Sequence, residues 1–297
     1  MHIHLDKKQL AAVQNSGTES KLKLVRRLEG SEFRVLGRFD QLSPVRVGYS
    51  RYELGCAAGT ATAMLHHDCF SPTQREAQFG EIVQVWGDLY ENGGGHLIAV
   101  QRFACLSMDV PASVVALLPR DWVLPTFVPQ LKTVISSWIS VSTPALKRFL
   151  SDAFRDSNIA MGFLNAPASQ CYHHAYPGGL LDHSADMLER FEKGSIGNWN
   201  LSQRDLTVCL ILLHDIGKTV TLVGKSRAIR GAYQPHEFAT LELLASPLAR
   251  LEVNAPQLAN KIRGYFKPKG WYPRNYDPVY RVVSAIDRKS ADYPQDD

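Results

Sequence analysis

The pattern of hydrophobic and polar positions changes along the chain from strand-like to helical. Between residues 33 and 106, short runs of β-forming residues are separated by Gly, Pro, Ser and Asn. These runs predict five β-strands, at 33–39, 45–54, 60–66, 81–90 and 95–106. After residue 130, apolar residues recur at i, i+3, i+4 and i+7, which predicts helices. The predicted helices are 131–141, 144–154, 179–192, 202–218, 236–245 and 278–289.

The last two predicted strands are the clearest part of the β-region. Residues 82–86 alternate, Gly87 marks a bulge or bend, and residues 91–95 supply the glycines of a hairpin turn. Five short strands with a kinked hairpin at the end predict an OB-type β-barrel, and another small barrel or a half-sandwich is the alternative. Three aromatic residues are candidates either for stacking on bases or for the barrel core: Trp86, Tyr90 and Phe103.

The chain therefore predicts an α+β multidomain protein. We expect residues 1–30 to be a flexible lead-in, because they are polar and basic near the start. Residues 31–110 would form the OB-type barrel and bind nucleic acid. Four prolines indicate a linker at 111–130, and residues 131–297 would form an all-helical domain.

Composition narrows the class of protein. With 297 residues, 45% of them hydrophobic, the chain can bury a sizeable core. No stretch approaches the roughly 18 apolar residues that a membrane span needs, and no secretory signal is apparent, so we expect a soluble, cytoplasmic protein without a membrane partner. Five scattered cysteines with no Cys-x-x-Cys pair argue against a disulfide framework and a thiolate zinc site.

The predicted helix 202–218 carries the first candidate chemistry. It opens with Ser202 and Asp205 in a capping arrangement, is apolar on every side, and delivers His214 and Asp215 near its end. A buried carboxylate is costly unless a cation or strong donors compensate it. On this pair alone, a metal site and a helix-end ion pair are equally good interpretations.

Two other predicted helices carry a metal-ligand residue beside an apolar stripe. His183 lies among apolar residues of 179–192, and Asp287 follows the stripe of 278–289. A set of imidazole and carboxylate donors suits Mn²⁺, Fe²⁺, Ni²⁺, Zn²⁺ or Mg²⁺.

These residues resemble the ligand pattern His, His-Asp, Asp of the HD-domain phosphohydrolase superfamily, through His183, His214, Asp215 and Asp287. Residues 131–188, above all the segment His-His-Ala-Tyr-Pro-Gly-Gly-Leu-Leu-Asp-His at 173–183, resemble the bacterial OB-fold plus HD-domain 3′→5′ exoribonuclease family. A related signature occurs in HD-containing relaxase-type proteins of mobile elements. The resemblance implies a metal-dependent phosphodiesterase, a 3′→5′ exonuclease on single-stranded RNA or DNA.

The sequence departs from that family in one respect. Members commonly carry a further His or His pair on a helix before the final Asp, whereas residues 261–267 contain none. His236 is the remaining candidate, either as a substrate or second-sphere group or as an exposed residue at a helix start. We therefore expect one divalent ion, with Mn²⁺ favoured and Mg²⁺, Fe²⁺, Ni²⁺ or Zn²⁺ as alternatives.

We expect further residues near these predicted ligands to contact the substrate. One of His173 and His174 would touch the scissile phosphate while the other caps or packs. Lys218 and Arg230 would neutralise charge in the transition state. The candidate catalytic residues are Asp215, Lys218, His236 and His174.

Charge placement favours a polyanionic substrate. Residues 218–274 contain ten Lys or Arg and three Asp or Glu, and 265–276 alternates aromatic with basic residues. That alternation suits a single strand, and a solvated loop is the alternative. The candidate substrate-binding residues are His173, Arg230, Lys267, Lys269, Trp271 and Arg274. Single-stranded nucleic acid is the expected partner, and a homo-oligomer is compatible with the sequence.

Two other functions compete with the exonuclease. One is an HD nucleotidase or deoxynucleotide triphosphohydrolase, which would leave the β-barrel and the aromatic-basic segment unexplained. The other is a non-catalytic nucleic-acid-binding component of a mobile-element processing complex.

Overall fold

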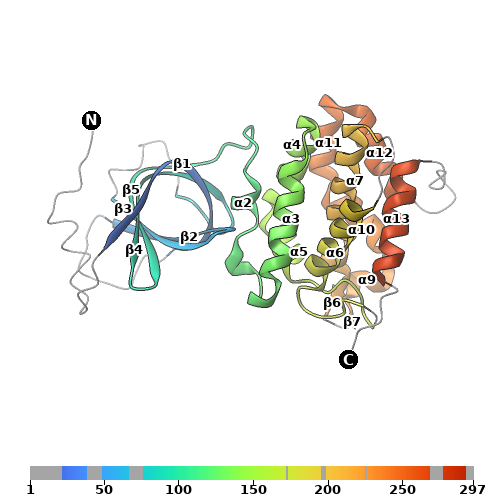
Figure 1. Ribbon diagram of the computed structural model, residues 1–297, viewed down its shortest axis with the longest axis horizontal. Helices are drawn as coiled ribbons and strands as arrows, with labels where there is room; N and C mark the ends of the chain where they lie inside the picture. The colour runs from blue at the N-terminus through green and yellow to red at the C-terminus, as the bar shows by residue number, and fades with distance from the viewer. Residues whose placement is uncertain are drawn as a thin grey trace. The chain divides into compact units, whose positions relative to one another are not determined.

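The chain folds into two compact units, residues 1–110 and 111–297 (Figure 1). The computed structural model describes residues 22–38, 49–66, 76–171, 173–194, 199–224, 226–267 and 277–291. The first unit consists of strands and the second mainly of helices, which confirms the predicted order of a β-barrel followed by a helical region. Within the described residues, no helix is both long and apolar enough to span a membrane.

The first unit is a closed five-stranded barrel. Its strands are β1 (Lys23–Arg38), β2 (Tyr49–Cys56), β3 (Gly59–His66), β4 (Ile82–Asn92) and β5 (Gly95–Cys105). They follow the order β1-β2-β3-β5-β4, and β1 closes the barrel by pairing with β4. The β3–β5 pair is parallel, and the other pairs are antiparallel.

Alternating side chains of the strands fill the barrel interior. In β3, Ala61, Ala63 and Leu65 are buried and the residues between them are half-buried, as the period of two requires. Phe103 stacks on Tyr52 at a ring-centroid distance of 5.1 Å and belongs to the core. Of the three aromatic candidates, Phe103 is therefore a residue of the barrel core, whereas Trp86 and Tyr90 are only half-buried.

Gly87 forms the predicted bulge in β4. The β4–β5 register shifts between Trp86 and Gly87, and Gly87 has φ 155°. A Cβ atom at this position would lie 2.2 Å from the carbonyl oxygen of Ala99. Only glycine allows the two backbones to approach so closely.

The predicted lead-in at 1–30 is wrong for its last part, because β1 begins at Lys23. Residues 23–30 pair with β4, from Lys23 opposite Glu91 to Glu29 opposite Trp86. Leu28 is the first buried residue of this strand, and Leu24 and Val25 are exposed. The inward-outward alternation that marks a strand in the sequence is therefore missing where β1 starts.

The second unit is built around one helix, α7, whose residues 205–213 are all buried. Its longer helices are α3 (Val128–Ser140), α4 (Pro144–Arg155), α5 (Ser157–Asn165), α6 (Gly179–Lys193), α7 (Leu201–Leu213), α10 (His236–Leu243), α11 (Ala245–Asn254), α12 (Pro256–Phe266) and α13 (Pro278–Ala291). Short elements are α2 (Val114–Leu117), η2 (Arg120–Trp122), η3 (Pro125–Phe127), α8 (Lys218–Thr221), β6 (Leu222–Val223), β7 (Ser226–Arg227) and α9 (Ile229–Tyr233). Helices α3, α4, α6 and α13 all contact α7 (Figure 1).

Residues 111–130 belong to this helical unit and do not form the predicted linker. They fold into α2, η2, η3 and the start of α3, and α2 packs on α3 and α4. Leu117 and Leu118 are fully buried. Pro125 and Pro129 lie in the first turns of η3 and α3, because the fixed φ of proline suits a first helical turn. The boundary between the units lies at Val110 and Pro111.

Helix α7 also ends earlier than predicted. It stops at Leu213, and residues 214–217 form a turn before α8. Its capping box is formed by Asn200 and Gln203, not by Ser202 and Asp205. Asp205 is buried and accepts hydrogen bonds from Ser142 and Thr143 at the start of α4.

Candidate metal centre

Three helices bring their metal-ligand residues together. His183 lies on α6, His214 follows α7, and Asp287 lies on α13. The Nε2 atoms of the two imidazoles are 3.2 Å apart, and Oδ1 of Asp287 lies 3.2 Å from Nε2 of His183 and 3.8 Å from Nε2 of His214. One ligand atom from each residue lies within 4.8 Å of the others. The structure thus joins three of the four predicted ligands into one group.

The second nitrogen of each imidazole is held by a hydrogen-bond partner. Nδ1 of His183 lies 3.0 Å from the Ser290 hydroxyl, and Nδ1 of His214 lies 2.8 Å from the Ile211 carbonyl oxygen. When each Nδ1–H donates to these oxygens, each Nε2 presents a lone pair to the common point. Two neutral imidazoles and a carboxylate fit a divalent cation of the type predicted from the sequence.

Asp215, the fourth predicted ligand, connects this group to two other candidate residues. Its Oδ2 lies 3.3 Å from Nε2 of His214 and 3.9 Å from Nε2 of His183. Lys218 Nζ donates to the same Oδ2 at 2.5 Å, and Nε2 of His236 lies 3.2 Å from Oδ1. Asp215, Lys218 and His236 are therefore neighbours, as a shared catalytic role requires.

The charges of the site are strongly coupled. Burial acts to raise the pKa of Asp215, but His214 and Lys218 hold it well below its usual value. Burial lowers the pKa of His183. Burial also acts to lower the pKa of His214, but the nearby carboxylates of Asp215 and Asp287 raise it above its usual value. The pKa values of the two imidazoles are thus shifted in opposite directions, by burial for His183 and by the neighbouring carboxylates for His214.

The loop before α6 places His174 beside His183, the first predicted ligand. The rings of His174 and His183 have centroids 5.3 Å apart, and Nδ1 of His174 lies 3.1 Å from Oδ2 of Asp182. The Tyr176 hydroxyl donates to the same oxygen at 2.5 Å. Hydrogen bonds from these two residues hold the pKa of Asp182 below its usual value, although burial acts in the opposite direction.

The Pro-Gly-Gly sequence explains the shape of this loop. Gly178 has φ 83° at the N-cap of α6, and a Cβ on Gly179 would lie 2.0 Å from the carbonyl oxygen of His174. Both glycines are needed for the chain to turn this tightly into the helix. The carbonyl oxygen of His173 accepts a hydrogen bond from the Ser169 hydroxyl at 2.8 Å, so His173 has a backbone role in the same loop.

A cavity of about 510 Å³, here named the Lys218 cleft, adjoins the residues around Asp215. Lys218 and His236 line it together with residues that the sequence analysis did not single out, above all Arg227 and Tyr233. Their signal in the sequence is weak, because β7 and α9 are only two and five residues long.

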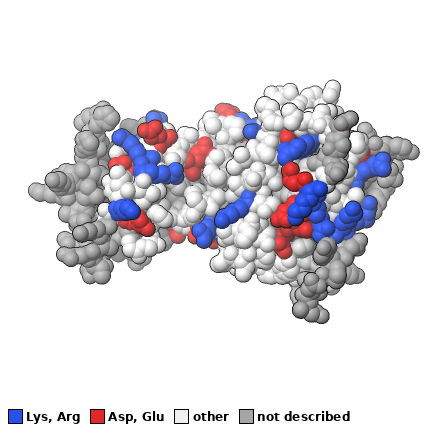
Figure 2. All heavy atoms as spheres, in the orientation of Figure 1, with Lys and Arg blue, Asp and Glu red and all other residues white. Residues whose placement is uncertain are grey.

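Much of the predicted basic excess is engaged in ion pairs. Arg230 pairs with Glu242, and its Nε donates to the Gln234 side chain at 2.7 Å. Arg250 pairs with Asp152 and Arg263 with Glu252, and Figure 2 shows basic and acidic side chains next to one another on the face of the helical unit in view. Lys267 is exposed after α12, and Lys269, Trp271 and Arg274 lie outside the described residues.

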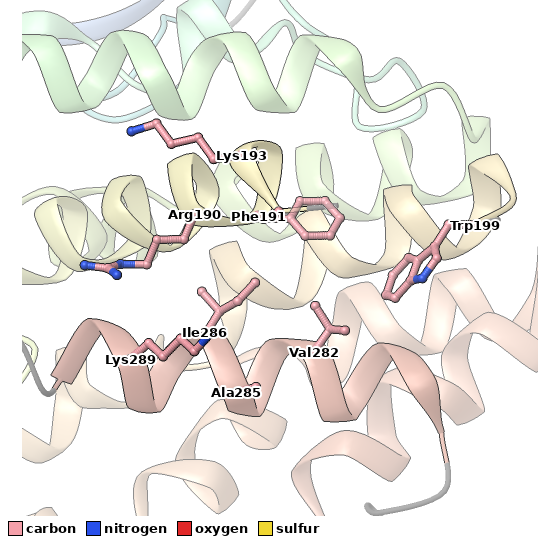
Figure 3. Close-up of a pocket in the computed structure, with 9 residues that line it drawn as sticks. Arg190, Phe191, Lys193, Trp199, Val282, Ala285, Ile286 and Lys289 are labelled. Carbon is pink, nitrogen blue, oxygen red and sulfur yellow. The ribbon is translucent and has the colours of Figure 1, made fainter. Parts of the chain in front are cut away.

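A second cavity, of about 470 Å³, lies against α6 and α13 (Figure 3). Apolar side chains such as Phe191 and Val282 line it, with the cations Arg190, Lys193 and Lys289. Arg190 and Lys193 already pair with Asp186 and Glu189 on α6. None of the described candidate residues lines this cavity, so the Lys218 cleft is the better candidate for substrate.

One family model matches the chain, over residues 116–197. It is the TraI_2 family, whose description reads "Putative helicase". The matched segment extends from α2 to the end of α6, so it contains His174 and His183 but neither His214 nor Asp287. No curated protein matches the chain.

Proposed function

We propose that the chain is a metal-dependent phosphodiesterase that acts on single-stranded nucleic acid as a 3′→5′ exonuclease. The observation that carries this proposal is the convergence of His183, His214 and Asp287, with the second nitrogen of each imidazole already held. The set of nitrogen and oxygen donors, beside a cleft that contains a lysine, favours a centre for phosphate chemistry. The proposal includes the HD-domain assignment that the ligand pattern suggests.

His183, His214 and Asp287 would hold one divalent ion, with Asp215 as the fourth ligand. Such an ion supplies a water molecule of lowered pKa and polarises a phosphate oxygen. Lys218, anchored on Asp215, would neutralise charge on the phosphate oxygens as the phosphorus–oxygen bond breaks. His236 would hold a proton at Nε2 for the leaving hydroxyl, and His174 would orient the phosphate from the other side of His183.

The barrel supports nucleic acid as the substrate class. A closed five-stranded barrel with a parallel β3–β5 pair fits the predicted OB type, a fold that binds oligonucleotides. The Arg102 guanidinium lies over the half-buried ring of Trp86, 4.4 Å from its centroid, and such cation and ring pairs suit single strands. The family match adds support, because a helicase description belongs to nucleic-acid processing.

The same match favours a second candidate, a nucleic-acid-processing component of a mobile element. Residues 116–197 include the His-His-Ala signature that relaxase-type proteins share. Such a component would bind or nick a strand without digesting it from an end. A test of function must therefore separate exonuclease, endonuclease and binding activities.

The test uses the full chain with Mn²⁺ and single-stranded RNA or DNA, as a 5′-labelled linear strand and as an internally labelled, covalently closed circle. We expect a ladder of shortening products from the linear strand and no cleavage of the circle, because an exonuclease needs an end. Cleavage of the circle would show that the protein is an endonuclease and would reject the exonuclease. Binding without turnover in any metal would reject a hydrolase.

Two controls assign the activity to this site. Asp287→Ala should lose the metal and the activity while its far-ultraviolet circular dichroism stays unchanged, because the carboxylate is a ligand and 43% of its side chain is exposed. Mononucleotides and deoxynucleoside triphosphates incubated with the wild type test the nucleotidase alternative. Release of inorganic phosphate or triphosphate from them, with intact oligonucleotides, would reject the exonuclease.

A further inference from the structure

Tyr233 ends α9 in the lining of the Lys218 cleft, with 88% of its surface exposed. Tyrosine is usually at least half-buried in folded domains, because its ring gains free energy on leaving water. The cleft is thus lined by an uncovered aromatic ring and by Lys218 and His236, which contact Asp215.

The segment that carries Tyr233 is fixed in place on both sides. A Cβ on Gly231 would lie 2.1 Å from the carbonyl oxygen of Thr221, so α9 sits directly on the end of α8. The Gln234 side chain donates to Glu242 on α10 at 2.7 Å. Helix α8 begins with Lys218 and α10 begins with His236, so Tyr233 is held relative to both residues.

Arg227 supplies a cation in the same lining. It lies on β7, opposite Leu222 of β6, and its side chain is exposed. Within the described part of the chain, no carboxylate pairs with Arg227, in contrast to Arg230, which pairs with Glu242. An exposed guanidinium and an exposed ring in the lining of one cleft are a combination that can bind the phosphate and the base of one nucleotide.

We infer that the Lys218 cleft is the subsite for the 3′-terminal nucleotide of the strand, with its base stacked on Tyr233 and Arg227 as the counter-charge of the backbone phosphates. This inference rests on the proposed function and names the substrate unit that the site takes. A volume of about 510 Å³ lies in the range of small-molecule sites and accommodates one nucleotide. Because every base offers a π-face, the subsite accepts any of the bases.

The experiment measures binding of the full chain to single-stranded oligonucleotides by fluorescence anisotropy in EDTA, which removes catalysis. One oligonucleotide has an ordinary 3′-terminal nucleotide, and its match has an abasic residue at that position. Tyr233→Ala should weaken binding of the ordinary strand about tenfold to a hundredfold and leave binding of the abasic strand unchanged. Tyr233→Phe should bind both strands like the wild type.

Arg227→Ala tests the charge. It should weaken binding of both strands and reduce the slope of log K against log salt by about 0.7, the value for one lost phosphate contact. Phe238→Ala and Arg120→Ala are matched controls, because these exposed residues do not line the cleft. Both controls should bind like the wild type.

The result that would overturn the subsite is specific. If Tyr233→Ala binds the ordinary strand as the wild type does, or loses equal affinity for both strands, the ring does not stack on the terminal base. Digestion of the linear strand by the wild type would then leave the proposed function standing. Conversely, Tyr233→Ala could weaken binding of the ordinary strand alone while the wild type shows no hydrolase activity. That result would support the subsite and reject the exonuclease.

Discussion

The hydroxyl oxygen of Ser290 lies 3.0 Å from Nδ1 of His183, so the last turn of α13 orients a ring on α6. Asp287, one turn earlier on α13, faces Nε2 of the same ring at 3.2 Å. Helix α13 therefore contributes both one candidate ligand, Asp287, and the hydrogen-bond partner of another, His183. Second hydrogen bonds of this kind fix the tautomer and the direction of a metal-binding imidazole.

We predict that Ser290→Ala weakens binding of the divalent ion about tenfold to a hundredfold without unfolding the protein. Without the acceptor, the His183 ring loses its fixed orientation and Nε2 presents its lone pair less often to the ion. Competition with a metal chelator measures the affinity. Ser284→Ala, on the same helix and only half-buried, is the control and should bind metal like the wild type. Equal affinities of the two variants would show that the Ser290 contact does not orient the ligand.

His236→Ala should keep the metal and slow the reaction. The side chain of His236 contacts Asp215 and is 34% exposed, and it is not a member of the three-residue ligand group. Metal content measured by elemental analysis should match the wild type, whereas His214→Ala should lose the ion. Metal loss in His236→Ala equal to that of His214→Ala would instead make His236 a direct ligand and favour a two-ion site.

The sequence predicted that His183, His214 and Asp287 would lie close together, for a physical reason. His183, His214 and Asp287 each follow or interrupt an apolar stripe that has to face the core, so their helices deliver them to the same interior. The five strands were also predictable, because the alternation in segments such as β3 reports which side chains face the barrel interior.

Features that depend on the register between distant elements could not be predicted. The pairing of Arg230 with Glu242 depends on how α9 meets α10, and the sequence shows only two charges twelve positions apart. Helix α5 follows α4 almost directly, with Asp156 as its cap, and leaves no boundary in the hydrophobic pattern. Helix α9 is too short for a periodic signal, so the position of Tyr233 in the lining of the Lys218 cleft appears only in three dimensions.

Gly217→Ala should disturb the end of α10 that carries His236. Gly217 has an ordinary helical φ of −62°, so backbone strain is not the reason for glycine here. A Cβ at this position would lie 2.0 Å from the carbonyl oxygen of His236, which forces α10 away from the turn. Overpacking of this kind costs about 1–3 kcal/mol of the free energy of unfolding and should move His236 from Asp215.

The measurements for Gly217→Ala are a denaturation curve and the rate of strand digestion. The double variant with His236→Ala separates the two effects. If the loss of rate acts through His236, the double variant is no slower than His236→Ala alone. A further drop in rate in the double variant would mean that Gly217 supports catalysis by another route.

Asp205→Ala should be the most destabilising of these changes. The carboxylate is fully buried, and its Oδ2 accepts hydrogen bonds from the backbone N–H and the hydroxyl groups of Ser142 and Thr143, the shortest at 2.6 Å from Thr143 Oγ1. Its removal leaves the donors of half-buried Thr143 and exposed Ser142, just before α4, without this partner. Four lost hydrogen bonds to one buried carboxylate together cost about 2–4 kcal/mol.

Urea denaturation of the full chain, followed by helical circular dichroism, measures this cost. Asp156→Ala is the matched control, because Asp156 caps α5 from an exposed position and accepts one backbone hydrogen bond at 2.8 Å. That exposed cap is worth about 1 kcal/mol, since water can replace it. If Asp205→Ala is no less stable than Asp156→Ala, the buried carboxylate does not hold α4 against α7, and the packing of apolar side chains around α7 joins these helices by itself.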